Sequence, residues 1–342
     1  MGTNKVIVTG GLGYIGSHTA VELSEKFQVV IVDDLSNSSI EVLDGISKIS
    51  NSTPIFEKLD LKIKKDVKKL FDKHNDAIGL IHFAAFKAVG ESVEKPLNYY
   101  ENNLSSLIYI LQEIDNRNLL LNLIFSSSCT VYGQAESLPI TEEESIKKAE
   151  SPYGNTKQIS EEILFDYART NPKINITSLR YFNPIGAHHS TNIGELPLGI
   201  PGNLVPFITQ TAAGIHEKLT VFGNDYNTPD GTCVRDYIHV MDLAKAHIIA
   251  LEHLIQKRNQ DNYSVYNIGT GKGSSVLEVI ECFVKNTRVK LNYVIGKRRV
   301  GDIESAYADN TKAKEELKWT PKYSLDDAIL SAWKWEKKVR NI

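Results

Sequence analysis

A glycine-rich turn between an apolar strand and a helix is the feature that most limits how this chain can fold. The apolar run Val6–Val8 leads into Thr9–Gly16, which reads TGGLGYIG, and a second apolar run, 28–33, follows after a gap that fits one helix. Glycines at this spacing allow a tight turn, a close approach of phosphate to the backbone and close packing of the helix on the strand. A strand, glycine turn, helix and strand in this order are typical of a parallel α/β sheet.

Short apolar runs continue through the first half of the chain and alternate with helical patterns. We expect further strands at 54–59, 78–83, 121–126 and 176–181. Their apolar composition predicts burial on both faces. Apolar residues recur at helical spacing in 104–114 and 159–167. The fold class predicted is α/β, a Rossmann-like doubly wound parallel sheet.

The composition of the chain changes after about residue 182. Residues 183–203 are rich in Gly, Pro, His and Asn and predict a long ordered loop. Beyond it we expect helices at 205–213 and 240–254, strands at 264–268 and 290–295, and a closing helix from Leu325. We therefore predict a sheet domain over 1–180 and a smaller mixed α/β domain over 181–342, with segments crossing back onto the first.

Composition argues against several classes of protein. The 342 residues include 39 basic and 42 acidic side chains, a net charge of −3, without the basic excess that nucleic acids or anionic membranes usually attract. Cys129, Cys233 and Cys282 are far apart and form no CxxC pair, so we expect neither a metal site nor a disulfide framework. No apolar run approaches the roughly 18 residues of a membrane span, and no signal-peptide pattern opens the chain. The expectation is a soluble, cytoplasmic protein.

Acidic and small residues follow the predicted strands where a dinucleotide would bind. A carboxylate at Asp33, the end of the second strand, can accept hydrogen bonds from an adenosine ribose and would repel a 2′-phosphate, which favours NAD over NADP. The helix after the glycine turn would present free N–H groups to the phosphates. Asp60 and Phe83–Ala85 fall at strand ends that would line the same crevice. Alternatively, Asp33 and Asp34 simply cap a turn.

Tyr153 and Lys157 are the strongest candidates for catalysis. Ser151-Pro152 suits a helix start, so the two side chains, four residues apart, should share one helical face. Lowering a tyrosine pKa from about 10 to near 7 takes roughly 4 kcal/mol, which a nearby ammonium and a cationic nicotinamide could supply. Ser128, just after a predicted strand, could hydrogen-bond the reacting hydroxyl. A solvated helix face and a serine-rich loop are the alternatives.

The glycine turn, the strand-end serines and the YxxxK motif, in this order, resemble the extended short-chain dehydrogenase/reductase family. Within it the chain is most similar to the UDP-glucose 4-epimerase branch, because matching stretches run nearly end to end. LRYFNPIGAH (179–188) and VRDYIHVMDL (234–243) are the most specific of them. The resemblance implies a homodimer that binds NAD and UDP-sugars.

The implied reaction is the 4-epimerisation of UDP-hexoses through a transient 4-keto sugar. Carbon 4 of a hexose is not adjacent to a carbonyl, so its C–H bond is not acidic enough for direct proton abstraction, and oxidation to a ketone solves this. Tyr153 would exchange the hydroxyl proton while NAD takes and returns the hydride. The result is an isomerase with no net redox change.

The resemblance also implies roles for individual residues. The catalytic residues would be Tyr153, Lys157 and Ser128. The cofactor would be bound by Gly10, Gly13, Tyr14, Ile15, Gly16, Asp33, Asn37, Ser38, Asp60, Leu61, Phe83, Ala84, Lys87, Asn102, Ser126, Tyr153, Lys157 and Tyr181. The nucleotide sugar would be bound by Lys87, Ser128, Tyr153, Asn183, Asn203, Phe222, Arg235, Tyr237, Arg299, Asp302 and Ala306. If the resemblance to the family is set aside, residues 297–299 are interpreted as a solvated basic face and Phe222 as a core residue.

Three positions depart from the pattern of the family. Ala85 replaces a common glycine, and Val300 follows Arg299 where an acidic residue is common. Ala306 stands where a bulky tyrosine favours plain hexoses and a small residue admits N-acetylhexosamines. We therefore hypothesise use of both UDP-galactose/UDP-glucose and UDP-GalNAc/UDP-GlcNAc. The alternative is that Ala306 merely packs a loop and Tyr307 fills the space.

Two other functions fit the same motifs. A nucleotide-sugar 4,6-dehydratase shares the fold, NAD and YxxxK, but its family places Asp-Glu just after the strand-end hydroxyl residue, where this chain has Cys129 and Thr130. A non-catalytic NAD-binding sensor typically lacks the tyrosine or the lysine, and both are present. Helices over 97–115 and 153–169 would form the dimer interface, although their apolar stripes could equally face the sheet.

Overall fold

The computed structural model describes residues 4–299 and 302–342, so Val300 lies outside the described residues. Contacts divide the chain into two compact units. The first unit comprises 1–133, 145–181 and 244–266, and the second comprises 134–144, 182–243 and 267–342. Within the described ranges, no helix is both long enough and apolar enough to cross a bilayer.

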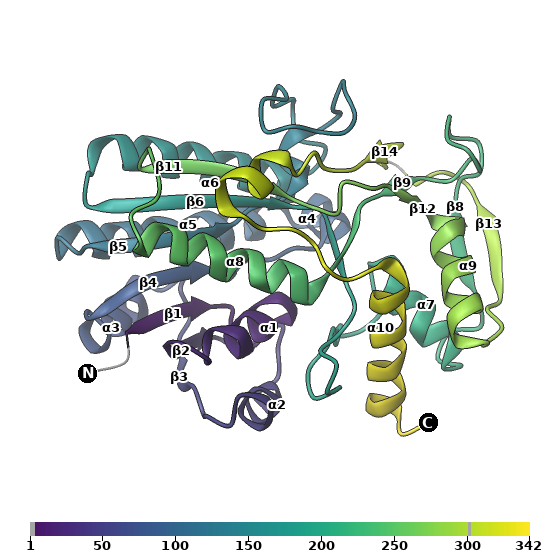
Figure 1. The fold of residues 1–342 in the computed structure, drawn as a ribbon, viewed down its shortest axis with the longest axis horizontal. Helices are drawn as coiled ribbons and strands as arrows, with labels where there is room; N and C mark the ends of the chain where they lie inside the picture. The colour runs from purple at the N-terminus through teal and green to yellow at the C-terminus, as the bar shows by residue number, and fades with distance from the viewer. Residues whose placement is uncertain (1–3, 300–301) are drawn as a thin grey trace. The chain divides into compact units, whose positions relative to one another are not determined.

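A seven-stranded sheet forms the centre of the first unit, in the order β11-β6-β5-β4-β1-β2-β3 (Figure 1). The strands are β1 (Lys5–Thr9), β2 (Gln28–Asp33), β3 (Ile55–Lys58), β4 (Ala77–His82), β5 (Leu121–Ser126), β6 (Ile174–Tyr181) and β11 (Tyr263–Ile268). β1 pairs in parallel with both β2 and β4, and the pairs β2–β3, β4–β5 and β5–β6 are parallel as well. The strand order therefore reverses between β1 and β4, and the predicted doubly wound α/β fold is confirmed.

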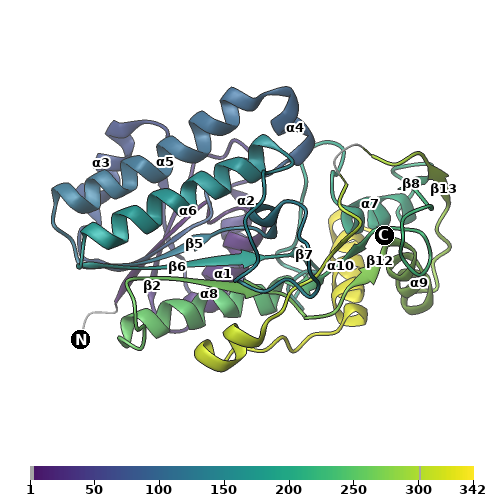
Figure 2. The same ribbon diagram turned by 90° about the horizontal axis from the view of Figure 1, so that it is seen from above.

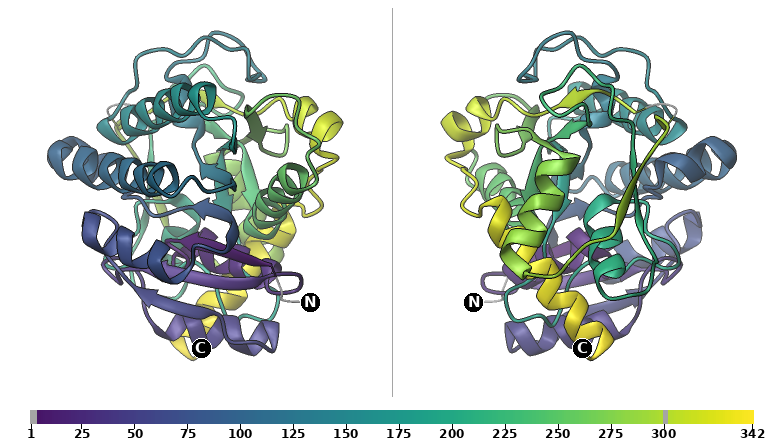
Figure 3. Two further views of the ribbon diagram at one scale, coloured as in Figure 1. Left: turned by 90° about the vertical axis from the view of Figure 1, so that its left-hand side faces the viewer. Right: turned by 90° about the vertical axis from the view of Figure 1, so that its right-hand side faces the viewer.

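Helices cover both faces of this sheet (Figures 2 and 3). One face carries α1 (Tyr14–Leu23), α2 (Glu41–Ser50) and α8 (Val240–Ile255), and the other carries α3 (Lys64–Lys73), α5 (Pro96–Asn116) and α6 (Pro152–Thr170). The short helix α4 (Val89–Glu94) precedes α5. The strands are buried between the two helical layers, which explains why their sequences are apolar without alternation.

The apolar stripe predicted on α5 faces the core of the first unit. Leu107, Leu111 and Ile114 are buried in one cluster with residues of β4 and β5. Burying such a side chain contributes about 1.5–3 kcal/mol each. The sequence left open whether this stripe faces the sheet or a dimer interface. In the structure it packs against the sheet.

In its described residues the second unit contains three α-helices, the π-helix Ala313–Leu317, two two-stranded sheets and one three-stranded sheet, which surround a core of their own. Its elements are α7 (Leu204–Ala212), α9 (Val276–Thr287), α10 (Leu325–Arg340), β7 (Asn183–Ile185), β8 (Leu219–Phe222), β9 (Val234–Arg235), β10 (Tyr237–His239), β12 (Ser274–Ser275), β13 (Tyr293–Gly296) and β14 (Ser305–Ala306). The start of α10 at Leu325 agrees with the prediction. The expected strand 290–295 begins three residues later, at Tyr293.

Helix α9 was not predicted, although its sequence carries a start signal. Ser275 accepts a hydrogen bond from the Glu278 N–H, and the Glu278 side chain accepts one from the Ser275 N–H, which is a capping box. Val279, Ile280 and Phe283 follow at helical spacing and are buried. The strands of two to four residues in this unit are too short to show any periodicity.

Replacing Gly16 by alanine is expected to destabilise the first unit. A Cβ at this position would lie 2.3 Å from the Gly10 carbonyl oxygen, so the backbone must move, at a cost of about 1–3 kcal/mol. Gly90→Ala is the matched control, because nothing lies within 4 Å of a Cβ added there. Thermal unfolding of the two variants measures the effect. A melting temperature of Gly16→Ala equal to that of the unmodified protein would contradict the steric argument.

Candidate functional site

The glycine turn lies at the carboxyl end of β1, next to the switch point of the sheet. Gly10 has φ +64°, and a Cβ there would lie 2.8 Å from the Ala84 nitrogen. A Cβ on Gly13 would meet only the Gly10 carbonyl oxygen, at 3.2 Å. Gly13 also precedes α1 without any side-chain cap. The protein itself therefore requires glycine at positions 10 and 16, while the space at Gly13 suits the approach of an anion to the helix N-terminus.

Asp33 ties the glycine turn to the end of β2. Its Oδ2 accepts a hydrogen bond from the Leu12 N–H at 3.0 Å, and its Oδ1 accepts from the Leu35 N–H at 3.0 Å and from Ser38 Oγ at 2.7 Å. Asp33 therefore caps the turn, as the alternative interpretation of this residue predicted. Binding of a ribose at the same carboxylate stays a prediction.

The end of β4 is held against the end of β1 by a buried histidine. Thr9 Oγ1 is hydrogen-bonded to His82 Nδ1 at 2.8 Å and accepts from the Ala84 N–H at 3.3 Å. Burial, together with the nearby Lys157 charge, lowers the pKa of His82 to about 3, so the ring is neutral. Phe83 and Ala84 are therefore positioned beside the glycine turn.

The other predicted cofactor-binding residues belong to the first unit, and some of them are buried while others are exposed to solvent. Tyr14 and Ile15 begin α1, and Asn37 is exposed after β2. Leu61 is buried after β3, where Asp60 Oδ1 accepts from the Lys62 N–H at 2.9 Å. Lys87 is exposed between β4 and α4, and Asn102 lies on α5 with its amide bonded to Asn103.

The predicted catalytic residues are brought together at the start of α6. The helix begins at Pro152, and Ser151 caps it by accepting from the Gly154 N–H at 3.1 Å, as its sequence predicted. Lys157 is 4% exposed and donates from Nζ to the Ser126 carbonyl oxygen at 2.7 Å. Its Nζ lies 5.9 Å from the centroid of the Tyr153 ring.

The two strand-end serines of β5 contact two tyrosines. Ser128 lies close enough to Tyr153 to affect its pKa, and Ser126 Oγ is hydrogen-bonded to Tyr181 Oη at 2.8 Å. All these groups belong to the first unit. The structure therefore assembles the predicted triad of Tyr153, Lys157 and Ser128, together with Ser126 and Tyr181.

Burial shifts both titratable groups of this triad towards their neutral forms. It raises the pKa of Tyr153, and the nearby Ser128 hydroxyl acts in the opposite direction. Burial lowers the pKa of Lys157 to about 8, while the Glu161 carboxylate acts against this shift. Tyr153 is thus a protonated phenol in the protein alone, and it needs additional positive charge nearby to act as a base.

Sequence reasoning missed a buried polar network behind the triad. Glu161 and Arg180 form an ion pair at 2.6 Å, and each side chain is 6% exposed. Ser127 Oγ donates to Glu161 at 2.5 Å. The position of Glu161, four residues after Lys157 on the same helix, was the signal that could have identified it.

Four predicted nucleotide-sugar residues come together in the second unit through strand pairing. Arg235 on β9 lies opposite Ala306 on β14, and Tyr237 on β10 lies opposite Asn183 on β7. Asp236 lies between β9 and β10 in the chain. It is fully buried and accepts from the N–H groups of Thr270, Gly271 and Ala308. Asp236 therefore fixes the backbone on either side of it.

Phe222 and Arg299 form a second part of this region. Phe222 is 44% exposed, so its interpretation as a core residue was wrong. The Arg299 guanidinium lies 5.7 Å from the centroid of the Phe222 ring and is paired with Asp302 at 2.7 Å. Asn203 lies at the start of α7 with its amide donating to Glu195.

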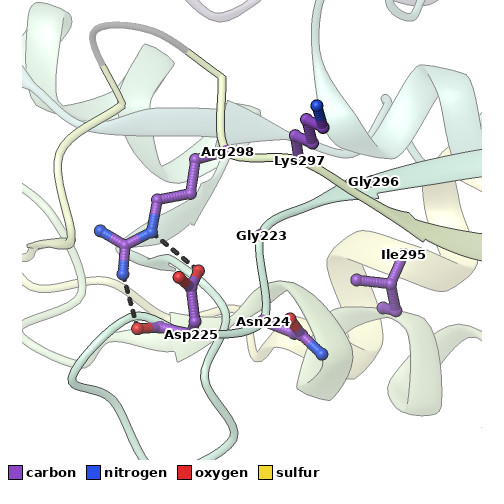
Figure 4. A pocket seen from close by; sticks show the side chains of 7 residues that line it. All are labelled: Gly223, Asn224, Asp225, Ile295, Gly296, Lys297 and Arg298. Carbon is purple, nitrogen blue, oxygen red and sulfur yellow. Dashed lines mark hydrogen bonds and ion pairs between the residues drawn. The ribbon is translucent and has the colours of Figure 1, made fainter.

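An open pocket of about 520 Å³ is lined by residues 223–225, which directly follow Phe222 in the chain, and by residues 295–298 (Figure 4). Arg298 donates to Asp225 at 2.8 Å, as Figure 4 shows, and its guanidinium lies 4.1 Å from the centroid of the Tyr226 ring. Residues 297–299 are all exposed, as expected of a solvated basic face, and Arg298 is in addition paired with Asp225 and stacked on Tyr226.

Comparison with known proteins identifies relatives over almost the entire chain. A family model described as GDP-mannose 4,6 dehydratase matches residues 7–331. UDP-glucose 4-epimerase of Dictyostelium discoideum is 46% identical over 97% of this chain and 96% of its own length. UDP-glucose 4-epimerase of Bacillus subtilis is also 46% identical, over the same shares of the two chains.

Solved structures agree with these sequence relatives. UDP-glucose 4-epimerase of Bifidobacterium longum, in complex with NAD⁺ and UDP, is 43% identical with a TM-score of 0.94, over 99% of both chains. The enzyme of Stenotrophomonas maltophila, with bound NAD and formylated UDP-arabinopyranose, is 44% identical with the same TM-score and coverage. Because identity and coverage are high throughout, the chain belongs to the UDP-glucose 4-epimerase family.

Proposed function

We propose that this protein interconverts UDP-glucose and UDP-galactose through a 4-keto intermediate, with NAD as a permanently bound cofactor. The observation that carries the proposal is the buried assembly of Tyr153, Lys157 and Ser128 in the first unit. The assembly follows β5. This strand pairs with β4, and β4 pairs with β1, the strand that leads into the glycine turn. Membership of the epimerase family supports the choice of reaction.

The residues at the strand ends fit NAD. Gly13 leaves room at the N-terminus of α1 for a pyrophosphate, and the Asp33 carboxylate is suited to ribose hydroxyls rather than to a 2′-phosphate. Phe83, Ala84 and Ser126 would line the remainder of the site. When bound, NAD supplies the hydride acceptor and donor for carbon 4 of the sugar.

Tyr153 would remove the proton of the 4-hydroxyl group and later return it. Its buried phenol needs positive charge to ionise, and Lys157 supplies an ammonium group 5.9 Å from the ring centroid. Ser128, which lies beside Tyr153, would orient the reacting hydroxyl. Lys157 is in turn held by the Ser126 carbonyl oxygen.

The second unit would bind the UDP portion. Arg235 and Arg299 would neutralise the diphosphate with their guanidinium groups. The exposed Phe222 ring offers a face for a planar base. We further propose that Asn183, Asn203, Tyr237 and Asp302 complete the nucleotide site.

The dehydratase alternative is disfavoured by the residues after Ser128. Elimination of water requires an additional acid and base, and this chain offers Cys129 and Thr130 there. Thr130 Oγ1 already donates to Ser128 Oγ at 3.0 Å. The dehydratase name of the matching family model therefore describes the shared fold type and not the reaction proposed here.

We propose that the active form is a cytoplasmic homodimer. Leu97 on α5 is 79% exposed and Phe165 on α6 is 46% exposed, and Val93 on α4 is exposed as well. These apolar side chains lie outside the buried stripe of α5 and would be covered by a second copy. None of the three cysteines forms a disulfide in the part of the chain that the structure describes, which supports a reducing location.

Incubation of the purified protein with UDP-galactose tests the proposed reaction directly. We expect equilibration with UDP-glucose without added NAD, because the cofactor is retained through the cycle. Separation of the sugars by anion exchange follows the reaction, and denaturation of the protein should release NAD. Formation of a 4-keto-6-deoxy sugar, release of NADH, or no turnover would contradict the proposal.

Tyr153→Phe should lower kcat about 10²–10⁴-fold, because it removes the group that exchanges the proton. Tyr167→Phe on the same helix is the matched control, since its hydroxyl accepts from Asn171 and Tyr167 is not one of the predicted site residues. Initial rates with UDP-galactose measure both. Retention of more than a tenth of the activity by Tyr153→Phe would refute its role.

We propose that both plain hexoses and N-acetylhexosamines are substrates, because position 306 is a small residue beside Arg235. A solved relative from Campylobacter jejuni described as a UDP-Glc/GlcNAc 4-epimerase is 34% identical, with a TM-score of 0.83. Tyr307 follows the end of β14, and its ring lies near Gly273. Tyr307 is therefore poorly placed to fill the space beside Ala306.

Ala306→Tyr should reduce turnover of UDP-GlcNAc at least about tenfold while turnover of UDP-glucose changes little, because the ring would occupy the space of the N-acetyl group. Ala306→Ser serves as the control of similar size. Steady-state kinetics with both sugars measure the ratio. Turnover of UDP-GlcNAc by the unmodified protein below about one-hundredth of that of UDP-glucose would reject dual use.

A further inference from the structure

Glu161 extends the line of catalytic residues on α6 into the interior. Tyr153, Lys157 and Glu161 are spaced four residues apart and share one face of the helix. Both Glu161 and Arg180 on β6 are buried. A buried carboxylate is retained only where strong partners compensate for its lost hydration.

Charge-assisted hydrogen bonds occupy both oxygens of this carboxylate. Oε1 accepts from Ser127 Oγ at 2.5 Å and from Arg180 Nε at 3.0 Å. Oε2 accepts from Arg180 Nη2 at 2.6 Å and from Nε at 3.1 Å. Such bonds are roughly twice as strong as neutral ones and fix direction as well as distance.

The network holds the strand end that carries the reacting groups. Ser127 lies between Ser126, whose carbonyl oxygen accepts from Lys157, and Ser128, which lies beside Tyr153. The Ser127 N–H also donates to the carbonyl oxygen of residue 179, at 2.9 Å. Both the backbone and the side chain at position 127 are therefore anchored.

Arg180 anchors the other end of the same segment. Its Nη1 donates to Tyr132 Oη at 3.0 Å, and its guanidinium lies 4.8 Å from the centroid of the Tyr132 ring. Tyr132 ends the short 3₁₀ helix Cys129–Tyr132, for which Ser128 is the N-cap. Movement of Arg180 or Glu161 would thus be transmitted to Ser128.

Glu161 is also the anion next to two buried cations, Lys157 and Arg180. The other titratable groups that face this cluster are His82 on β4, Tyr153 on α6, Cys129 and Tyr132 on the 3₁₀ helix, Tyr181 on β6, and Tyr263 on β11. Burial keeps His82 neutral and raises the pKa of Tyr153, Tyr181 and Tyr263. Among these described groups, Glu161 supplies the negative charge that opposes loss of the Lys157 proton.

We propose that Glu161 is a positioning residue for the reaction: with Arg180 it fixes the strand end that carries Ser126 and Ser128, and it keeps Lys157 in its ammonium form. The inference rests on the proposed function, in which the Lys157 charge promotes ionisation of Tyr153. The ion pair of Glu161 and Arg180 would thus contribute to catalysis as well as to the stability of the fold.

Glu161→Gln keeps the shape of the side chain and removes its charge. Lys157 and Arg180 would then be two buried cations without an anion, and Arg180 cannot lose its proton. Lys157 therefore deprotonates at lower pH, and the alkaline limb of the kcat–pH profile should move down by about one unit, a tenfold change in proton affinity. kcat at neutral pH should fall at least about tenfold.

Arg180→Met should move the same limb in the opposite direction. With the competing cation removed, the Glu161 carboxylate acts on Lys157 alone, so the alkaline limb should move to higher pH. Ser127→Ala removes only the hydrogen bond to the strand end and leaves both charges in place. It should lower kcat without moving the limb, because Lys157 keeps its electrostatic surroundings.

Profiles of kcat between pH 6 and 10, measured with saturating UDP-galactose on the NAD-loaded protein, decide between these roles. Opposite shifts for Glu161→Gln and Arg180→Met support the proposal. Unmoved limbs in both variants would overturn it, whether or not kcat falls. If Glu161→Gln does not fold, an unmoved limb in Arg180→Met, or full activity of Ser127→Ala, overturns the proposal.

The failure of the proposed function would be recognised separately. If the unmodified protein does not equilibrate the two sugars, the proposed reaction fails, and the pKa of Lys157 can still be measured by NMR of ¹³C-labelled lysine. Loss of the resonance in Lys157→Arg assigns it. A Lys157 pKa that is unchanged by Glu161→Gln and by Arg180→Met would then overturn the electrostatic role of Glu161.

Discussion

The meeting of parallel strand ends at one edge of the sheet is the constraint on which the rest of the first unit depends. Because β1, β2, β4 and β5 run in the same direction, Thr9, Asp33, His82 and Ser126 end at that edge. Each strand end then contacts a neighbour: Asp33 binds the N–H of Leu12, and Thr9 binds His82. The glycine turn and the catalytic serines are placed by this topology and not by their own loops.

Burial makes the catalytic groups of this edge depend on one another. A buried tyrosine and a buried lysine both shift towards neutral forms, which alone would oppose proton transfer. Placing Glu161 one helical turn after Lys157 offsets part of that shift, and Arg180 compensates Glu161 in turn. Stability and reactivity are therefore coupled through the same three charges. In the second unit Asp236 has a comparable structural task, since it orders the backbone that carries Arg235 and Ala306.

Local sequence signals predicted the first unit well. The strands 28–33 and 121–126 match β2 and β5, and the helix start at Ser151-Pro152 is found with its cap. These elements were predictable because apolar runs and caps act over a few residues. The second unit was harder, because its strands have two to four residues and are stabilised by partners far away in sequence. Phe222 shows the same limit, since an aromatic residue in an apolar strand predicts burial and only the fold leaves it exposed.

The amino-acid sequence by itself determined the fold class, the glycine turn and the spacing of Tyr153 and Lys157, because each depends on short-range geometry. The tertiary structure alone decided that Ser128 lies beside Tyr153, that Lys157 donates to Ser126, and that Glu161 pairs with Arg180. These contacts join helices and strands that are up to 31 residues apart in the chain. Their energies arise from burial, which strengthens charge interactions by removing water, and burial exists only once the sheet and both helical layers have assembled.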